Sequence, residues 1–186
     1  MKHSRLGVFP AFGLAATMFV TSLQPAAAAS AAEIDRDASA ALSDLYKHYP
    51  AAKALAKDAK AILVFPKIFK AGLMVGGETG DGVLRVKDKP VGYYNTSGVS
   101  YGLQVGAQTF GYAMFLMTDS AVKSLDKAQG LEVGVGPSVV VMDEGMAMKT
   151  STTTLQGDIY AIIFGQKGLM AGLGIQGSKI TKLDRR

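Results

Sequence analysis

The sequence predicts an α+β fold: a strand-rich, curved antiparallel sheet or barrel-like body with short N-terminal helices and one mid-chain helix. With 22 glycines, 6 prolines and no tryptophan, the composition is typical of strands joined by tight turns rather than of a helical bundle. Alanine, leucine and lysine dominate only residues 34–60, which confines the N-terminal helices to that part. Residues 98–108, in contrast, alternate with the period of a strand.

The first expected element is a signal peptide, residues 1–29. Two basic residues precede an apolar run (6–23), and a small-residue tract (26–32) with A-x-A spacing follows. We expect cleavage after Ala29, to within a few residues, and an exported protein that is periplasmic or secreted and peripheral to the membrane. An uncleaved anchor is the alternative, and the proline, glycine and hydroxyl residues within the run disfavour it.

The remaining residues, 30–186, are expected to form a single domain. The chain has no cysteine, which excludes disulfides, thiolate metal sites and a lipid-modified cysteine. Once the signal peptide is removed, basic residues only slightly outnumber acidic ones, and we expect no nucleic-acid partner.

Two helices are expected at residues 37–49 and 51–59, because Pro50 stands where a second helix would begin. The apolar run 61–65, which Pro66 closes, fits a buried strand and a buried helix-to-loop transition equally well.

From residue 73 onward, apolar segments alternate with turn signals. Residues 80–82 and 88–90 are predicted hairpin connections. A helix is expected at 121–128, capped at Asp119-Ser120 and ended at Gly130. The predicted strands are 73–79, 83–87, 92–95, 99–107, 112–117, 131–135, 139–142, 147–155, 159–164 and 169–177.

Within 99–107, apolar side chains form one face and glycine, serine and glutamine the other. Glycine at alternate positions weakens a strand, so something is expected to approach this face closely. A crossing strand, a packed helix and a ligand are three explanations, and a strongly curved sheet that needs glycines at its corners is the fourth.

The candidate binding residues are basic and apolar side chains that lie close together in sequence. Lys53, Lys57 and Lys60 are spaced to share a helix face, and Asp58 is the one acid in this stretch. Lysines near an anionic membrane and partly inserted phenylalanines both favour binding. An ordinary amphipathic helix with water-facing lysines is the alternative. The predicted lipid-binding residues are Lys53, Lys57, Lys60, Lys67, Lys70, Phe65 and Phe69.

Two catalytic or cofactor-binding motifs occur in the sequence, but the other residues that each of them requires are missing. Residues 98–102 match the G-x-S-x-G of serine hydrolases, but the only histidines, His3 and His48, both precede the serine. Residues 172–177 match G-x-G-x-x-G, but no acidic residue follows at the required distance. We expect no enzyme activity, no cofactor and no metal site.

Three ordered motifs resemble the SYLF domain family: AKAILVFPKIFKAG, then a glycine- and glutamine-rich stretch ending at Ala107, then GLMAGLGIQGS. The resemblance runs from about Leu55 to about Leu183. It implies binding of phosphoinositide or anionic phospholipid without catalysis, and fungal members are also described as actin-binding. An exported, bacterial-type member would meet neither cytosolic actin nor the usual phosphoinositides, so actin is a doubtful partner.

The predicted function is therefore non-catalytic binding of anionic phospholipid, or of phosphoinositide-like head groups, through the basic N-terminal region. The alternative is a structural envelope module that binds a protein partner through its glycine-rich strands. The first hypothesis predicts salt-sensitive binding to anionic vesicles that charge reversal at Lys53, Lys57 and Lys60 weakens, and the second predicts indifference to those changes.

Overall fold

The structure is a computed structural model that describes residues 29–126, 131–132, 138–142, 157–168 and 178–185. The predicted signal peptide, apart from Ala29, lies outside the described residues. So do the predicted strands 147–155 and 169–177 and most of 131–135.

Both predicted N-terminal helices are present: α1 (Ala31–His48) and α2 (Pro50–Asp58). α1 begins earlier than the predicted residue 37 because Ser30 and Glu33 form a capping box, in which each side chain bonds the other residue's backbone N–H. Pro50 opens α2, as expected. The buried residues of α1 recur at helical spacing and face the sheet; they are Ile34, Ala38, Leu42 and Leu45.

The body of the fold is one long, curled β-ribbon. β1 (Ala61–Val86) and β2 (Lys89–Leu116) pair antiparallel along nearly their whole lengths. Lys87 and Asp88 make the two-residue turn between them, with φ of 49° and 64°, as a primed hairpin turn requires. The predicted connection at 88–90 is confirmed to within a residue. Residues 61–65 form a strand rather than a helix-to-loop transition.

The predicted hairpin at residues 80–82 is wrong, because β1 runs through it without a break. Gly80 and Gly82 instead let β1 fold back across its own first half. A Cβ atom at Gly82 would lie 2.5 Å from the Phe65 ring, and one at Gly80 would lie 2.7 Å from the Lys67 carbonyl oxygen. The predicted strands between 73 and 117 are segments of β1 and β2.

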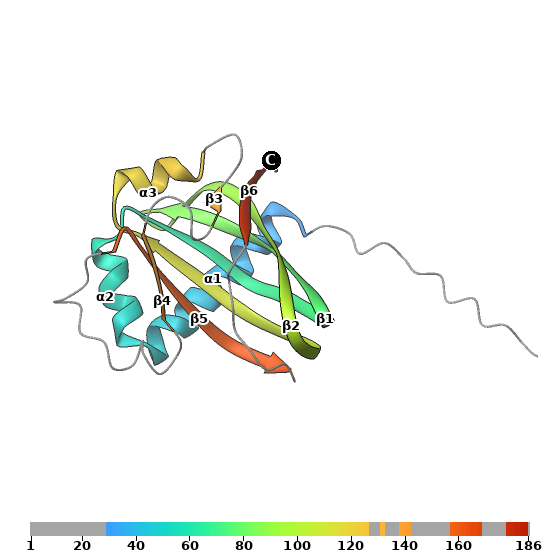
Figure 1. The fold of residues 1–186 in the computed structure, drawn as a ribbon. Helices are drawn as coiled ribbons and strands as arrows, with labels where there is room; N and C mark the ends of the chain where they lie inside the picture. The colour runs from blue at the N-terminus through green and yellow to red at the C-terminus, as the bar shows by residue number, and fades with distance from the viewer. Residues whose placement is uncertain (1–28, 127–130, 133–137, 143–156, 169–177, 186) are drawn as a thin grey trace, which may run out of the picture.

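Within the described residues, the sheet also contains four shorter strands: β3 (Leu131–Glu132), β4 (Val139–Met142), β5 (Ile159–Gly168) and β6 (Lys179–Leu183). The strand order is β3-β6-β2-β5-β4, with β1 also paired to β2. β6 pairs with the early part of β2 and β5 with its last part, and among these described pairs only β4–β5 is parallel. Figure 1 shows the ribbon bending between these parts. The strand-rich α+β fold with a curved sheet is confirmed.

The predicted mid-chain helix is also present, as α3 (Asp119–Ser124), and its N-cap is Thr118 rather than Asp119 or Ser120. Buried side chains form two clusters. Leu63 and Phe65 of β1 belong to the first, which lies under α3, and Ile62 and Val64 belong to the second, against α1 and α2. Both faces of β1 are therefore buried at its start, which explains why its sequence there is continuously apolar.

A candidate anionic-ligand groove

A groove of about 500 Å³ lies between α1, α2 and the β1–β2 hairpin. Its floor is apolar and includes Leu42 and Ile62, which are both buried. Its rim is charged. We call this surface the basic groove and define it by its polar lining residues: Tyr46, Lys53, Lys57, Lys60, Arg85, Lys87 and Asp88.

Three of the predicted lipid-binding lysines meet at this groove. Lys53 and Lys57 lie one turn apart on α2 and are both exposed, because α2 turns Ala52 and Leu55 toward the core. Lys60 follows the helix, and its backbone N–H donates to the Leu116 carbonyl oxygen at 2.8 Å. That bond fixes the backbone where β1 begins, and all three lysines line the groove on the side of α2.

The opposite side comes from the hairpin, which the sequence prediction did not include. Lys87 and Arg85 line the groove there, some thirty residues beyond α2 in the chain. Lys87 is exposed, whereas Arg85 is only 8% exposed. No local pattern pairs these residues with α2; only the return of β1 brings them to it.

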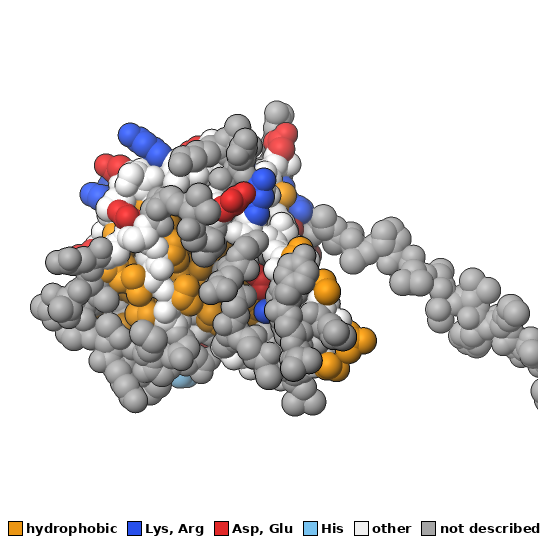
Figure 2. Space-filling model, in the orientation of Figure 1, with side chains coloured by type: hydrophobic (Ala, Val, Ile, Leu, Met, Phe, Trp, Pro, Cys, Tyr) orange, Lys and Arg blue, Asp and Glu red, His pale blue; other side chains and the backbone are white. Residues whose placement is uncertain are grey.

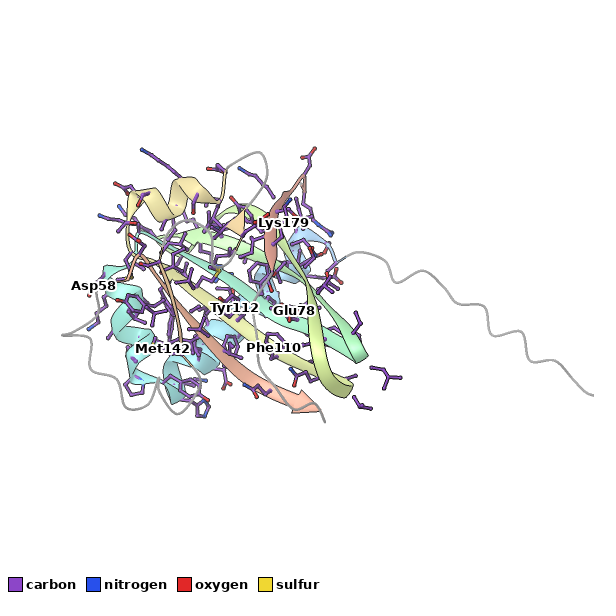
Figure 3. All side chains as sticks on the ribbon, in the orientation of Figure 1. Asp58, Glu78, Phe110, Tyr112, Met142 and Lys179 are labelled. Carbon is purple, nitrogen blue, oxygen red and sulfur yellow. The ribbon has the colours of Figure 1, made fainter. Side chains whose placement is uncertain are left out.

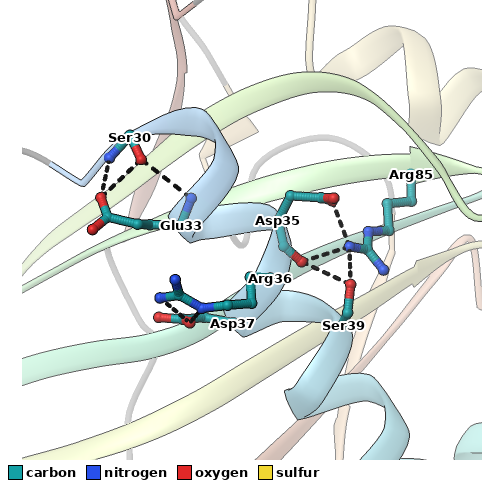
Figure 4. A network of polar contacts seen from close by, with 7 residues as sticks. All are labelled: Ser30, Glu33, Asp35, Arg36, Asp37, Ser39 and Arg85. Atoms are coloured by element: carbon teal, nitrogen blue, oxygen red, sulfur yellow. Dashed lines mark hydrogen bonds and ion pairs between the residues drawn. The ribbon is translucent and has the colours of Figure 1, made fainter.

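Arg85 is occupied by contacts that attach β1 to α1 (Figure 4). Its Nη2 donates to the Asp35 carboxylate at 2.5 Å, to the Asp35 carbonyl oxygen at 2.7 Å and to the Ser39 hydroxyl at 2.6 Å. The Asp35 carboxylate largely compensates its charge. The lysines therefore carry the free positive charge of the groove, and Arg85 holds its walls together.

Tyr46 supplies a neutral donor to the same groove. Its pKa is raised to about 12, mainly by burial and to a smaller extent by the Asp88 carboxylate, while Arg85 partly opposes both effects. At neutral pH the hydroxyl is therefore fully protonated and able to donate to an anionic oxygen. Asp88 is the one acid that lines the groove within the described residues.

The other four predicted residues lie elsewhere. Phe65 is fully buried, with its ring centroid 6.4 Å from that of Tyr112. Lys70 is also buried, at 2% exposed, and its Nζ lies 3.9 Å from Glu78 Oε2. Neither side chain reaches the molecular surface. Lys67 and Phe69 are exposed, but they lie farther along β1 and do not line the basic groove.

Lys70 belongs instead to a polar cluster inside the curled ribbon, where Figure 3 labels Glu78 and Tyr112. Ser178 donates to Glu78 Oε1, while Glu78 Oε2, Gln108 Nε2 and the Tyr112 hydroxyl have no hydrogen-bond partner among the described residues. Burial raises the pKa of Tyr112, and the Glu78 carboxylate adds to the effect. Gly98 lies against this cluster: a Cβ there would be 2.8 Å from Ser178 Oγ. Close approach in a curved sheet thus explains this glycine.

The described part of the chain contains no group of three or more histidine, aspartate and glutamate side chains placed to hold a metal ion. None of its helices combines the length and the apolar character needed to cross a bilayer.

Comparison with known proteins identifies a family for the C-terminal half. Residues 97–185 match the family described as "Ysc84: Las17-binding protein actin regulator", the SYLF domain family, whose description is that of a binding protein. No curated protein matches the chain. The matched segment begins after β1, so the basic groove lies outside it. Residues 97–185 therefore match the SYLF (Ysc84) domain family that the sequence motifs indicate.

Proposed function

We propose that the basic groove binds the phosphate of an anionic phospholipid at a membrane surface, and that the chain is exported and acts by binding rather than by catalysis. The observation that carries this proposal is the convergence around an apolar floor of four lysines from two separate parts of the chain, with a single acid beside them among the described lining residues. They are Lys53, Lys57, Lys60 and Lys87.

The chemistry of the groove suits a lipid head group in general rather than one species. Lysine ammonium groups act as mobile point charges, whereas rigid bidentate recognition of phosphate usually requires arginine. The one arginine here, Arg85, is bound to Asp35 and Ser39. The apolar floor offers a place for the glycerol and upper acyl carbons next to the phosphate. These features favour anionic phospholipid, with phosphoinositide-like head groups as one variety.

The test is co-sedimentation of the processed protein, purified after export, with phosphatidylcholine vesicles that contain or lack phosphatidylglycerol, over a salt series. Each lysine near an anionic surface contributes about 1 kcal/mol. Changing Lys53, Lys57 and Lys60 to glutamate should therefore weaken binding at least about 100-fold at low salt.

A matched control separates the groove from general charge. Lys57→Glu is compared with Lys123→Glu, which makes the same charge change on the exposed surface of α3. The proposal requires a clearly larger loss for Lys57→Glu. Equal losses of affinity for the two variants, or binding that depends on neither salt nor phosphatidylglycerol, would contradict the groove proposal.

A second candidate function is binding of an envelope protein by strand addition. Its supporting observation is that β1, 26 residues long, pairs only with β2 in the described part of the chain, which leaves its other edge unpaired. Lysine variants would not affect such binding. The actin link in the family description is not carried over, because an exported chain does not meet cytosolic actin.

A further inference from the structure

The bend of the β-ribbon exposes large apolar side chains. Phe69, Leu73 and Val75 of β1 are 50%, 68% and 55% exposed, and Val99 and Val105 of β2 are 54% and 71% exposed. Leu73 pairs directly with Val105, which puts both on one face of the ribbon. Figure 2 shows hydrophobic side chains gathered at this end of the molecule. We call these five residues the apolar tip.

The alternation of side chains is inverted in this part of the ribbon. Along β1 the exposed positions include Phe69, Leu73 and Val75, whereas the buried positions between and beyond them include Lys70 and Glu78. On β2, Gln108 is buried. A sheet in water normally buries its apolar face and exposes its polar one. Apolar outside with polar inside is the pattern of strands that contact lipid.

Two lysines border the apolar tip on one side. β-Bulges occur between Phe65 and Ile68 and between Thr109 and Gly111, and next to them lies a hollow of about 320 Å³ lined by Lys67, Thr109 and Lys167. Thr109 pairs with both Phe69 and Lys167, so the lysines lie within one strand of the tip. Both lysines are exposed, and neither forms a salt bridge with an acid among the described residues.

We propose that the apolar tip is a second lipid-contacting surface, which inserts into the interfacial layer of an anionic bilayer while Lys67 and Lys167 lie at its phosphates. The unpaired positive border complements an anionic lipid surface, whereas a second copy of this chain would present the same positive border. Five exposed side chains are also far fewer than the roughly 20–30 residues that each partner gives to a stable protein interface.

This inference deepens the proposed function and rests on the chain's binding lipid, but it concerns a different place. Twelve residues of β1 separate Ala61, at the basic groove, from Leu73, at the tip. At about 3.3 Å per residue that is roughly 40 Å along the strand. Both ends of β1, at Ala61 and Val86, lie at the groove, whereas Leu73 lies at the bend between them, so the two surfaces share no residue and can be altered independently.

The absence of tryptophan from the sequence allows a direct test. A single tryptophan is introduced as Leu73→Trp at the tip or, as a control, as Val91→Trp. Val91 is 54% exposed and lies beside the hairpin at the groove end. Each processed variant is mixed with phosphatidylglycerol–phosphatidylcholine vesicles that carry bromine on the acyl chains, and tryptophan quenching and vesicle sedimentation are both measured.

The proposal expects quenching and a blue shift for Leu73→Trp and little of either for Val91→Trp. Sedimentation of Leu73→Trp without quenching would overturn the proposal for the apolar tip and leave the groove proposal standing. Quenching of Val91→Trp alone would have the same consequence. No sedimentation of either variant would overturn both proposals.

Affinity provides a second readout. Leu73→Ser combined with Val105→Ser should lower vesicle affinity about tenfold or more, because exposed apolar area would no longer be buried. Val91→Ser should leave it unchanged. Because all three side chains are exposed, their loss should not unfold the chain, and thermal melts of the free variants check this. An equal effect of the tip and control substitutions would overturn the proposal.

Discussion

Replacing Lys70 with methionine distinguishes a structural lysine from a lipid-binding one. The substitution keeps an unbranched side chain of similar length but removes the charge that lies 3.9 Å from Glu78 Oε2. The carboxylate, in a side chain that is 4% exposed, would then keep only the Ser178 hydroxyl as a hydrogen-bond donor among the described residues. An uncompensated buried charge costs about 3–5 kcal/mol.

That cost is a large part of the stability of a domain of this size, which is about 5–15 kcal/mol. A domain of about 150 residues loses roughly 2–4 °C of Tm per kcal/mol, so Lys70→Met should melt about 6–20 °C below the parent. Adding Glu78→Gln removes the stranded charge and should recover most of the loss. Lys67→Met makes the same change on the exposed face and should stay within about 0.5 kcal/mol of the parent.

The assay is urea unfolding followed by circular dichroism, with vesicle binding measured on the folded protein. Equal stability of Lys70→Met and Lys67→Met, or a double variant no more stable than Lys70→Met alone, would refute the structural role of Lys70. A loss of vesicle affinity without a loss of stability would return Lys70 to the lipid-binding residues that the sequence predicted.

Three further outcomes are expected. Asp88→Gly should raise the free energy of unfolding by about 1 kcal/mol, because Asp88 has a φ of 64° that glycine adopts without strain, and an unchanged urea midpoint would contradict this. Hydrogen bonds from Ser138 lower the pKa of Asp158. Its carboxylate therefore stabilises the fold at pH values above the unfolded pKa near 3.8, and this contribution is lost as the pH falls through the lower folded pKa. Asp158→Asn should be less stable than the parent at neutral pH, and a stability difference that does not narrow in acid would count against this role of Asp158. Finally, a chain with two separate lipid-contacting surfaces should cluster anionic vesicles, measured as turbidity, and variants of either surface should lose clustering while they still bind vesicles.

Local sequence signals predicted the helices well. Pro50 marks the start of α2, and the apolar spacing of residues 34–45 follows one helix face. The earlier start of α1 was also readable, since Ser30 and Glu33 have the S-x-x-E spacing of a capping box. The Lys87–Asp88 turn was found only approximately, because lysine is not a usual residue at positive φ and neither position is a glycine.

The false turn at residues 80–82 shows where local signals fail. Glycine flanking aspartate is typical of a hairpin, but neither Gly80 nor Gly82 has a positive φ. They are needed because the first half of β1 crosses them so closely that an added Cβ would lie within van der Waals distance of its atoms. That crossing depends on how the ribbon curls, and no window of neighbouring residues records it.

The candidate site divides in the same way. The i, i+4 spacing of Lys53 and Lys57 on a helix is local and was predicted, whereas Lys87 joins them only through the return of the ribbon. Phe65 was misplaced on the surface because both faces of β1 are buried at its start. Lys70 was misplaced because strand alternation turns it inward while its neighbour Phe69 is exposed.

The buried Lys70–Glu78 pair and the exposed apolar tip are two consequences of one inverted pattern. Burying an ion pair whose carboxylate oxygen, Glu78 Oε2, accepts no hydrogen bond among the described residues gives little net stability and often less than apolar residues would. Exposing Leu73 and Val105 likewise forgoes apolar burial. Both departures from the usual burial of apolar side chains and exposure of charged ones lie around the bend of the ribbon. Such departures are expected where function rather than folding selects the residues. A lipid surface resolves the second departure directly, because it buries the apolar side chains that the fold leaves outside.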